Sequence, residues 1–180
     1  LRPEYIPQPV KFKKPAVFKS PKGKIELKEV PILLRKTVNN KAKQIKYAEE
    51  NHVFDDVAQT LAALKSKGYR LFLATAKPEI YARQILDHFD LLKYFDYPYG
   101  SELNGERTNK GELITYILEK EKLNPEECLM VGDREHDIFG ARKNAIETIA
   151  VEYGYGSKQE LDEAAPKARI AKFSELLNLI

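Results

Sequence analysis

Residues 128–137 read CLMVGDREHD, and this stretch decides the fold. Its first half is an apolar run typical of a buried strand, and Gly132 marks a turn directly after it. If the chain becomes helical near Arg134, Asp133 lies at the tip of the strand and Asp137 follows one helical turn later on the same side. Two carboxylates that converge at the carboxyl end of a buried strand suit a hard, oxygen-binding cation such as Mg²⁺.

Outward from this stretch, the chain after Tyr47 alternates between helical and strand patterns. The spacing predicts helices over residues 56–66, 77–89, 109–122, 137–143, 158–165 and 173–179. It predicts strands over 70–75, 128–131, 148–152 and 168–170, and a short strand or loop over 97–101. Alternation of this kind predicts an α/β fold, with a parallel sheet covered by helices on both faces. Ligands of such sheets bind beyond the carboxyl ends of the strands.

Size and composition limit the classes of protein that fit. A chain of 180 residues, 43% apolar and 32% charged, is long enough for one globular domain. No apolar run approaches the roughly 20 residues of a membrane span, so we expect no membrane association. The single cysteine, Cys128, lies in an apolar strand, which indicates a buried structural thiol. We expect an intracellular protein, in the cytoplasm or, since Leu1 suggests a processed start, the mitochondrial matrix.

The net charge of +3 conceals an asymmetry along the chain. Residues 1–46 hold 13 Lys/Arg and three acids, whereas residues 47–180 carry a net charge of −7. Six of the ten prolines also lie before residue 32, so residues 1–14 read as an extended basic arm. Such arms contact phosphate-rich surfaces, and RNA or a ribonucleoprotein is the partner expected for residues 1–46; a solvated tail is the alternative.

Polar landmarks follow the predicted strands and helix starts. Thr75 ends the strand over 70–75, Lys110 begins a helix that Asn109 caps, and Asp133 with Asp137 follows the strand over 128–131. A hydroxyl and a helix N-terminus donate to phosphate oxygens, and a lysine neutralises their charge. Carboxylates hold a metal that bridges to the phosphate. Each residue alone is a weak signal, and Lys110 alone would be read as a surface residue.

With these residues in this order, the sequence resembles the haloacid dehalogenase superfamily of phosphatases, most closely its phosphoglycolate-phosphatase-like members. The similarity covers residues 47–180. It is carried by the segments VFDDV (53–57), LFLATAKP (71–78), NKGE (109–112), VGDREHD (131–137) and VEYGYGS (151–157).

The resemblance implies the Rossmann-like three-layer sandwich of that superfamily. It also implies that Thr75 and Lys110 hold the phosphate of a small phosphorylated ligand, or inorganic phosphate. Asp133 would bind Mg²⁺ directly, with Asp137 supporting it.

The first motif of the family is missing. It should present an aspartate nucleophile and a second aspartate two residues later, but the first aspartate of the chain is Asp55. The best remaining strand is PAVF (15–18), which places Lys19 where the acid belongs. The segment before Phe54 is also too short for the usual cap domain, so a linker over residues 32–52 with one helix is expected in its place. Residues 15–180 would form the α/β domain.

A lysine cannot replace the aspartate, because an ammonium is not a nucleophile and repels Mg²⁺. Loss of the nucleophile leaves only residual activity from binding and electrostatics. The favoured hypothesis is therefore a degenerate phosphatase scaffold that acts as a binding or structural protein. The alternatives are an active Mg²⁺-dependent phosphomonoesterase whose first motif is absent from this sequence, and a weak enzyme or small-anion sensor.

Overall fold

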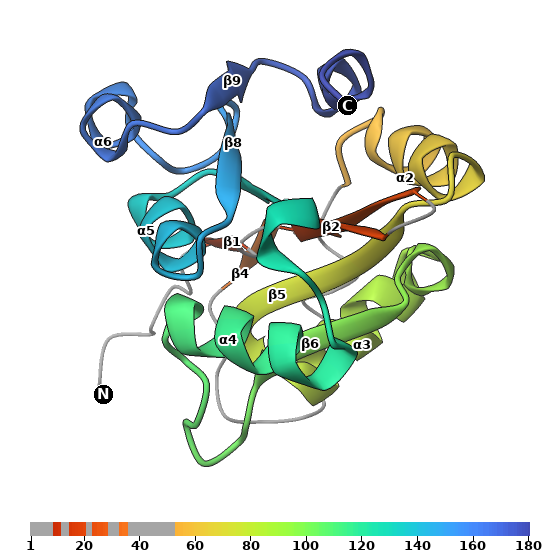
Figure 1. Cartoon of the computed structure of the whole chain (residues 1–180). Coiled ribbons are helices and arrows are strands. Elements are labelled where there is room, and N and C mark those ends of the chain that lie inside the picture. Colours follow the sequence, from red (N-terminus) through yellow and green to blue (C-terminus); the bar gives the residue numbers. More distant parts are fainter. Residues whose placement is uncertain (1–8, 12–14, 21–22, 29–32, 36–52) are drawn as a thin grey trace, which may run out of the picture.

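The computed structural model describes residues 9–11, 15–20, 23–28, 33–35 and 53–180, and Figure 1 shows their arrangement. The strands are β1 (Pro9–Lys11), β2 (Pro15–Ser20), β3 (Gly23–Lys28), β4 (Leu33–Arg35), β5 (Arg70–Pro78), β6 (Tyr97–Ser101), β7 (Cys128–Gly132), β8 (Glu147–Val151) and β9 (Ala168–Ile170). The α-helices are α2 (Val57–Ser66), α3 (Glu79–His88), α4 (Lys110–Glu121), α5 (Glu135–Lys143) and α6 (Lys158–Ala164). Short 3₁₀ helices cover η1 (Leu92–Tyr94), η2 (Pro125–Glu127) and η3 (Phe173–Asn178).

The main sheet has the strand order β6-β5-β2-β3-β7-β8-β9, and β2 also pairs with β7. β6 runs parallel to β5. β3 and β8 both pair in parallel with β7, and β9 pairs in parallel with β8. β2 is antiparallel to both β5 and β7, so these two strands run in the same direction. The carboxyl ends of β5 and β7 therefore lie at the same edge of the sheet. Thr75 lies in the last part of β5, and Asp133 directly follows β7.

The alternating side chains of β5 show which helices cover each face of the sheet. Leu71 and Leu73 join the buried core under α2 and α3, whereas Phe72 and Ala74 join the core under α4 and α5. Successive side chains of a strand point to opposite faces, so the two helix layers lie on opposite sides. α6 packs beside α5 over β8. The result is the predicted three-layer α/β sandwich (Figure 1).

The predicted elements from residue 56 onward are confirmed, with differences at some ends. β5 continues to Pro78, and α3 begins at Glu79 instead of Lys77. The ring of Pro78 disfavours a helical conformation of Lys77, which explains the later helix start. α5 begins two residues earlier than predicted, at Glu135, and the last predicted helix is a 3₁₀ helix.

The expectation for Lys19 is wrong. β2 pairs with both β5 and β7, but it runs antiparallel to them. Phe18 pairs with Arg70 and Cys128, the first residues of β5 and β7, so Lys19 lies toward the edge opposite Thr75 and Asp133. Only two residues connect β2 to β3, so these two strands must be antiparallel. Since β3 runs parallel to β7, β2 runs antiparallel to it.

Most of the segment before Val53 lies outside the described residues, including nearly all of the predicted arm over 1–14 and linker helix over 32–50. Within them, Pro9–Lys11 and Leu33–Arg35 form the paired strands β1 and β4, so the latter three residues are not helical. Binding of RNA through residues 1–46 stays a prediction. Of the helices in the described part of the chain, none is long and apolar enough to cross a membrane.

Candidate phosphate and metal site

The four predicted site residues are all buried, although each is polar. Thr75 is 1% exposed, Lys110 7%, Asp133 1% and Asp137 0%. Burying a charged group costs free energy unless it is paired and hydrogen-bonded. The contacts that compensate this cost show how the site is built.

Lys110 joins the end of β5 to the start of α5. Its Nζ donates to the carbonyl oxygen of Ala74, the residue before Thr75, and lies 3.2 Å from Oδ1 of Asp137. Asn109 sets the position of Lys110, because its Oδ1 accepts from the backbone N–H groups of Gly111 and Glu112 and caps α4. The expectation of a surface lysine, drawn from Lys110 alone, is wrong: Lys110 is buried against Ala74, the neighbour of Thr75, and against Asp137.

Asp137 has a second role at the start of α5. Its Oδ2 accepts from the backbone N–H of Arg134 at 3.1 Å, while its Oδ1 faces Lys110. The carboxylate therefore stabilises the turn that connects β7 to α5 and holds the lysine at the same time. A carboxylate in the first turn of a helix is also favoured by the helix dipole.

Asp133 is held by the loop after β8. Its Oδ2 accepts from the backbone N–H of Tyr155 at 2.6 Å. A Cβ atom on Gly154 would lie 2.0 Å from Cβ of Asp133, and one on Gly156 would lie 1.9 Å from the carbonyl oxygen of Asp133. The loop packs so closely on Asp133 that only glycine fits at these two positions. The sequence YGYG therefore contributes directly to the site.

Glu160 of α6 contacts the turn between the two aspartates. Its Oε1 accepts from Nε of Arg134 at 2.6 Å and from the backbone N–H of Glu135 at 2.9 Å. Burial alone would raise the pKa of Glu160, but these hydrogen bonds outweigh it and the pKa is lowered. Glu160 is therefore held as a carboxylate beside the site.

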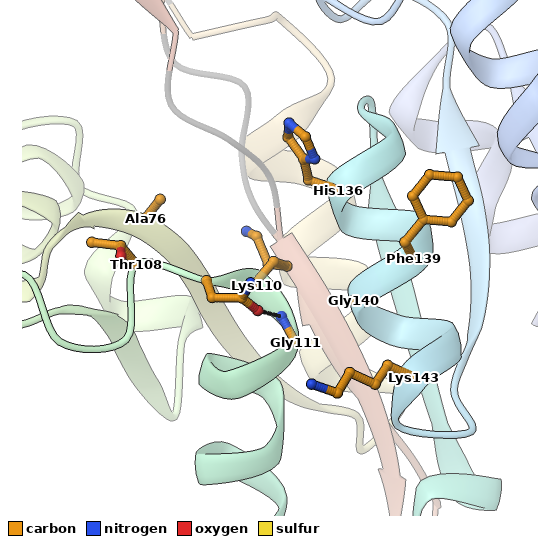
Figure 2. Close-up of a pocket in the computed structure, with 9 residues that line it drawn as sticks. Ala76, Thr108, Lys110, Gly111, His136, Phe139, Gly140 and Lys143 are labelled. Atoms are coloured by element: carbon orange, nitrogen blue, oxygen red, sulfur yellow. Dashed lines mark hydrogen bonds between the residues drawn. The ribbon is translucent and has the colours of Figure 1, made fainter.

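A cavity of about 390 Å³ opens between the start of α4 and one side of α5 (Figure 2). Lys110 lies at the centre of the view, with His136 toward one end and Lys143 toward the other. The lining consists of Ala76, Thr108, Asn109, Lys110, Gly111, His136, Phe139, Gly140 and Lys143. His136 is exposed. The lining holds two lysines, Lys110 and Lys143, and no carboxylate, which suits an anionic ligand.

Lys77 lies two residues after Thr75 and was not singled out from the sequence. Its backbone N–H donates to Oγ1 of Thr75 at 3.2 Å, within the stretch of β5 where the pairing with β6 is irregular. Burial lowers the pKa of the Lys77 ammonium from 10.5 to about 8.

The donor set fits a magnesium ion in its chemistry. Asp133 and Asp137 offer carboxylate oxygens, the ligands that Mg²⁺ prefers, and Mg²⁺ is usually held by one or two carboxylates together with water and phosphate oxygens. No group of three or more His, Cys, Asp and Glu side chains suited to a metal occurs in residues 53–180 or the other described segments.

The sequence did not identify Glu160 as part of the site, and it gave no role at the site to the YGYG loop. Glu160 lies 23 residues beyond Asp137, so no local pattern connects it to the metal motif. The one available signal was the sequence Ser157-x-x-Glu160, which predicts a helix start and thereby the position of α6.

Comparisons with known proteins identify the family of the chain. Residues 11–144, more than half of the chain, match the family described as haloacid dehalogenase-like hydrolase. A 5'-nucleotidase of Pseudomonas aeruginosa is 44% identical over 131 residues, which are 73% of this chain and 59% of that protein. A phosphoglycolate phosphatase of Colwellia psychrerythraea is 28% identical over 128 residues, 71% of this chain and 57% of that enzyme.

Among solved structures, a predicted phosphatase from Clostridium acetobutylicum superposes with a TM-score of 0.72 at 39% identity. The match covers 74% of this chain and 62% of that structure. The chain thus spans about 60% of the length of the relatives named here.

Proposed function

The chain belongs to the haloacid dehalogenase-like hydrolases, and from this membership we propose that it binds a phosphate monoester together with Mg²⁺ at Thr75, Lys110, Asp133 and Asp137. The observation that carries the proposal is the position of the buried Lys110 ammonium, which contacts both the end of β5 and Asp137. Ligands of parallel sheets bind at the carboxyl ends of the strands. A buried ammonium and two carboxylates at this edge suit a phosphate group with a bound metal ion.

Each residue has a distinct role in this proposal. The Thr75 hydroxyl donates to a phosphate oxygen, and the Lys110 ammonium neutralises phosphate charge as a point cation. Asp133 is a direct ligand of Mg²⁺, because its carboxylate lies at the strand tip and is oriented by Tyr155. Asp137 keeps the ammonium of Lys110 in place and supports the ion. Bound Mg²⁺ would polarise the phosphoryl oxygens that it contacts.

Residues 1–54 contain no aspartate, so this sequence lacks the aspartate pair that the family uses as its first motif. We therefore propose that the chain of residues 1–180 binds the ester and hydrolyses it slowly at most. The binding groups remain, and removal of a nucleophile leaves the interactions that orient the phosphate.

Full phosphomonoesterase activity is the second candidate. It is favoured by the relatives, which are named phosphatase and nucleotidase and extend well beyond the matched residues. In that case a carboxylate from outside residues 1–180 would complete the site. Mg²⁺-dependent hydrolysis of p-nitrophenyl phosphate by residues 1–180 would contradict the first candidate.

Calorimetric titration tests the binding function. Inorganic phosphate, phosphoglycolate and a nucleoside 5'-monophosphate are titrated into the chain with and without Mg²⁺. We expect Mg²⁺ to strengthen binding of at least one of them, and Asp133→Asn to remove that effect while leaving the fold intact, since the new amide oxygen still accepts from Tyr155. The matched control is Asp87→Asn on the exposed side of α3, which should change nothing. Equal Mg²⁺ dependence in wild type and Asp133→Asn would contradict the assignment.

A further inference from the structure

Glu160 contacts the metal turn without belonging to the motifs that define it. We propose that Glu160 is a positioning residue that fixes the turn between Asp133 and Asp137 in the geometry that binds Mg²⁺. This inference rests on the proposed function of the site.

One carboxylate oxygen holds two successive residues of the turn. Oε1 of Glu160 accepts from the Arg134 side chain and from the Glu135 backbone, and these residues directly follow Asp133. The ion pair is partly shielded from water, with Glu160 16% and Arg134 29% exposed in their side chains. Hydrogen bonds between charged groups are stronger than neutral ones and restrict geometry more tightly.

Capping of its own helix does not explain Glu160. In a capping box, Ser157 would accept from the N–H of Glu160, and the Glu160 carboxylate would return to the Ser157 N–H. The first half is present, with Oγ of Ser157 accepting at 3.0 Å. The carboxylate is directed instead at α5, where it accepts from the first helical N–H group, that of Glu135.

The same segment also holds Asp133 from its other side. The loop that ends at Ser157 donates the Tyr155 N–H to Asp133, and α6 follows directly. The loop thus contacts the carboxylate of Asp133 through Tyr155. The start of α6 contacts Arg134 and Glu135 through Glu160. Residues outside the ligand set that orient metal ligands in this way commonly change metal affinity 10–100-fold when they are replaced.

The decisive measurement is the Mg²⁺ affinity of the full chain by calorimetry, with thermal unfolding followed in parallel. We expect Glu160→Ala to bind Mg²⁺ about 10-fold more weakly than wild type. Glu160→Gln keeps an accepting oxygen and should recover to within about threefold of wild type. Glu163→Ala is the matched control, since Glu163 lies exposed on the same helix and accepts from Gln159.

A role in stability alone would lower the unfolding temperature of Glu160→Ala without changing its Mg²⁺ affinity relative to Glu163→Ala, and that result would overturn the inference. If Glu160→Ala does not fold, Arg134→Met decides, because it removes the side-chain contact and keeps the Glu135 hydrogen bond; unchanged Mg²⁺ affinity would again overturn it. Absence of Mg²⁺ binding in wild type would instead overturn the proposed metal site, and this inference with it.

Discussion

Nζ of Lys110 lies 3.2 Å from Oδ1 of Asp137, and both side chains are buried between α4, α5 and the end of β5. A buried ion pair of this kind is costly to break, because the remaining charge loses its partner and has no access to water. The pair therefore serves the stability of the fold as well as the proposed function.

Removing the cation alone should destabilise the protein. We expect Lys110→Met to lower the free energy of unfolding by about 3 kcal/mol, since breaking one side of a buried pair typically costs 3–5 kcal/mol. Adding Asp137→Asn should restore much of the stability, because the uncharged amide can still accept from the Arg134 N–H. Urea denaturation of the two single variants and the double variant measures this, and strictly additive losses would contradict the pairing.

The loop that covers Asp133 should not tolerate a side chain at Gly154. A Cβ atom there would lie 2.1 Å from Oδ2 of Asp133, so Gly154→Ala must displace the loop or the carboxylate. We expect a loss of about 1–3 kcal/mol in unfolding free energy, as for other overpacked sites, together with weaker Mg²⁺ binding.

Tyr155→Ala is the matched control for the loop, because it keeps the backbone N–H that donates to Asp133. It should retain Mg²⁺ affinity within about twofold, since the main-chain hydrogen bond is the contact that orients the carboxylate. Similar Mg²⁺ affinities for Gly154→Ala and Tyr155→Ala would show that the close packing is unimportant.

Lys77 should make stability rise with pH in mildly alkaline solution. Its pKa is about 8 in the folded protein and 10.5 ordinarily, so between pH 8 and 10 the unfolded chain binds more protons at this residue. The free energy of unfolding therefore gains a positive slope with pH in this window. Lys77→Met removes the titrating group, and the difference in unfolding free energy between wild type and variant should change across the window. A difference independent of pH would contradict the lowered pKa.

The fold could be predicted from the sequence because its signals are local. Apolar strands, the Asn109 cap and the turn at Gly132 each act within a few residues, and all appear in the structure. The burial of Lys110 could not be predicted from its own surroundings, since its partner Ala74 lies 36 residues away. Glu160 was missed for the same reason. β2 and β3 form a hairpin, and only one of them can run parallel to β7. The residue pattern alone does not determine which of the two does so.

Hydrolysis of p-nitrophenyl phosphate by the chain of residues 1–180, measured with and without Mg²⁺ beside Asp133→Asn, decides whether the site binds phosphate esters without turning them over. We expect the wild type to bind phosphate in a Mg²⁺-dependent way and to show no turnover above that of Asp133→Asn. Robust Mg²⁺-dependent turnover that Asp133→Asn abolishes would contradict the binding-only account. Because residues 1–54 contain no aspartate, the nucleophile would then be another group of the chain.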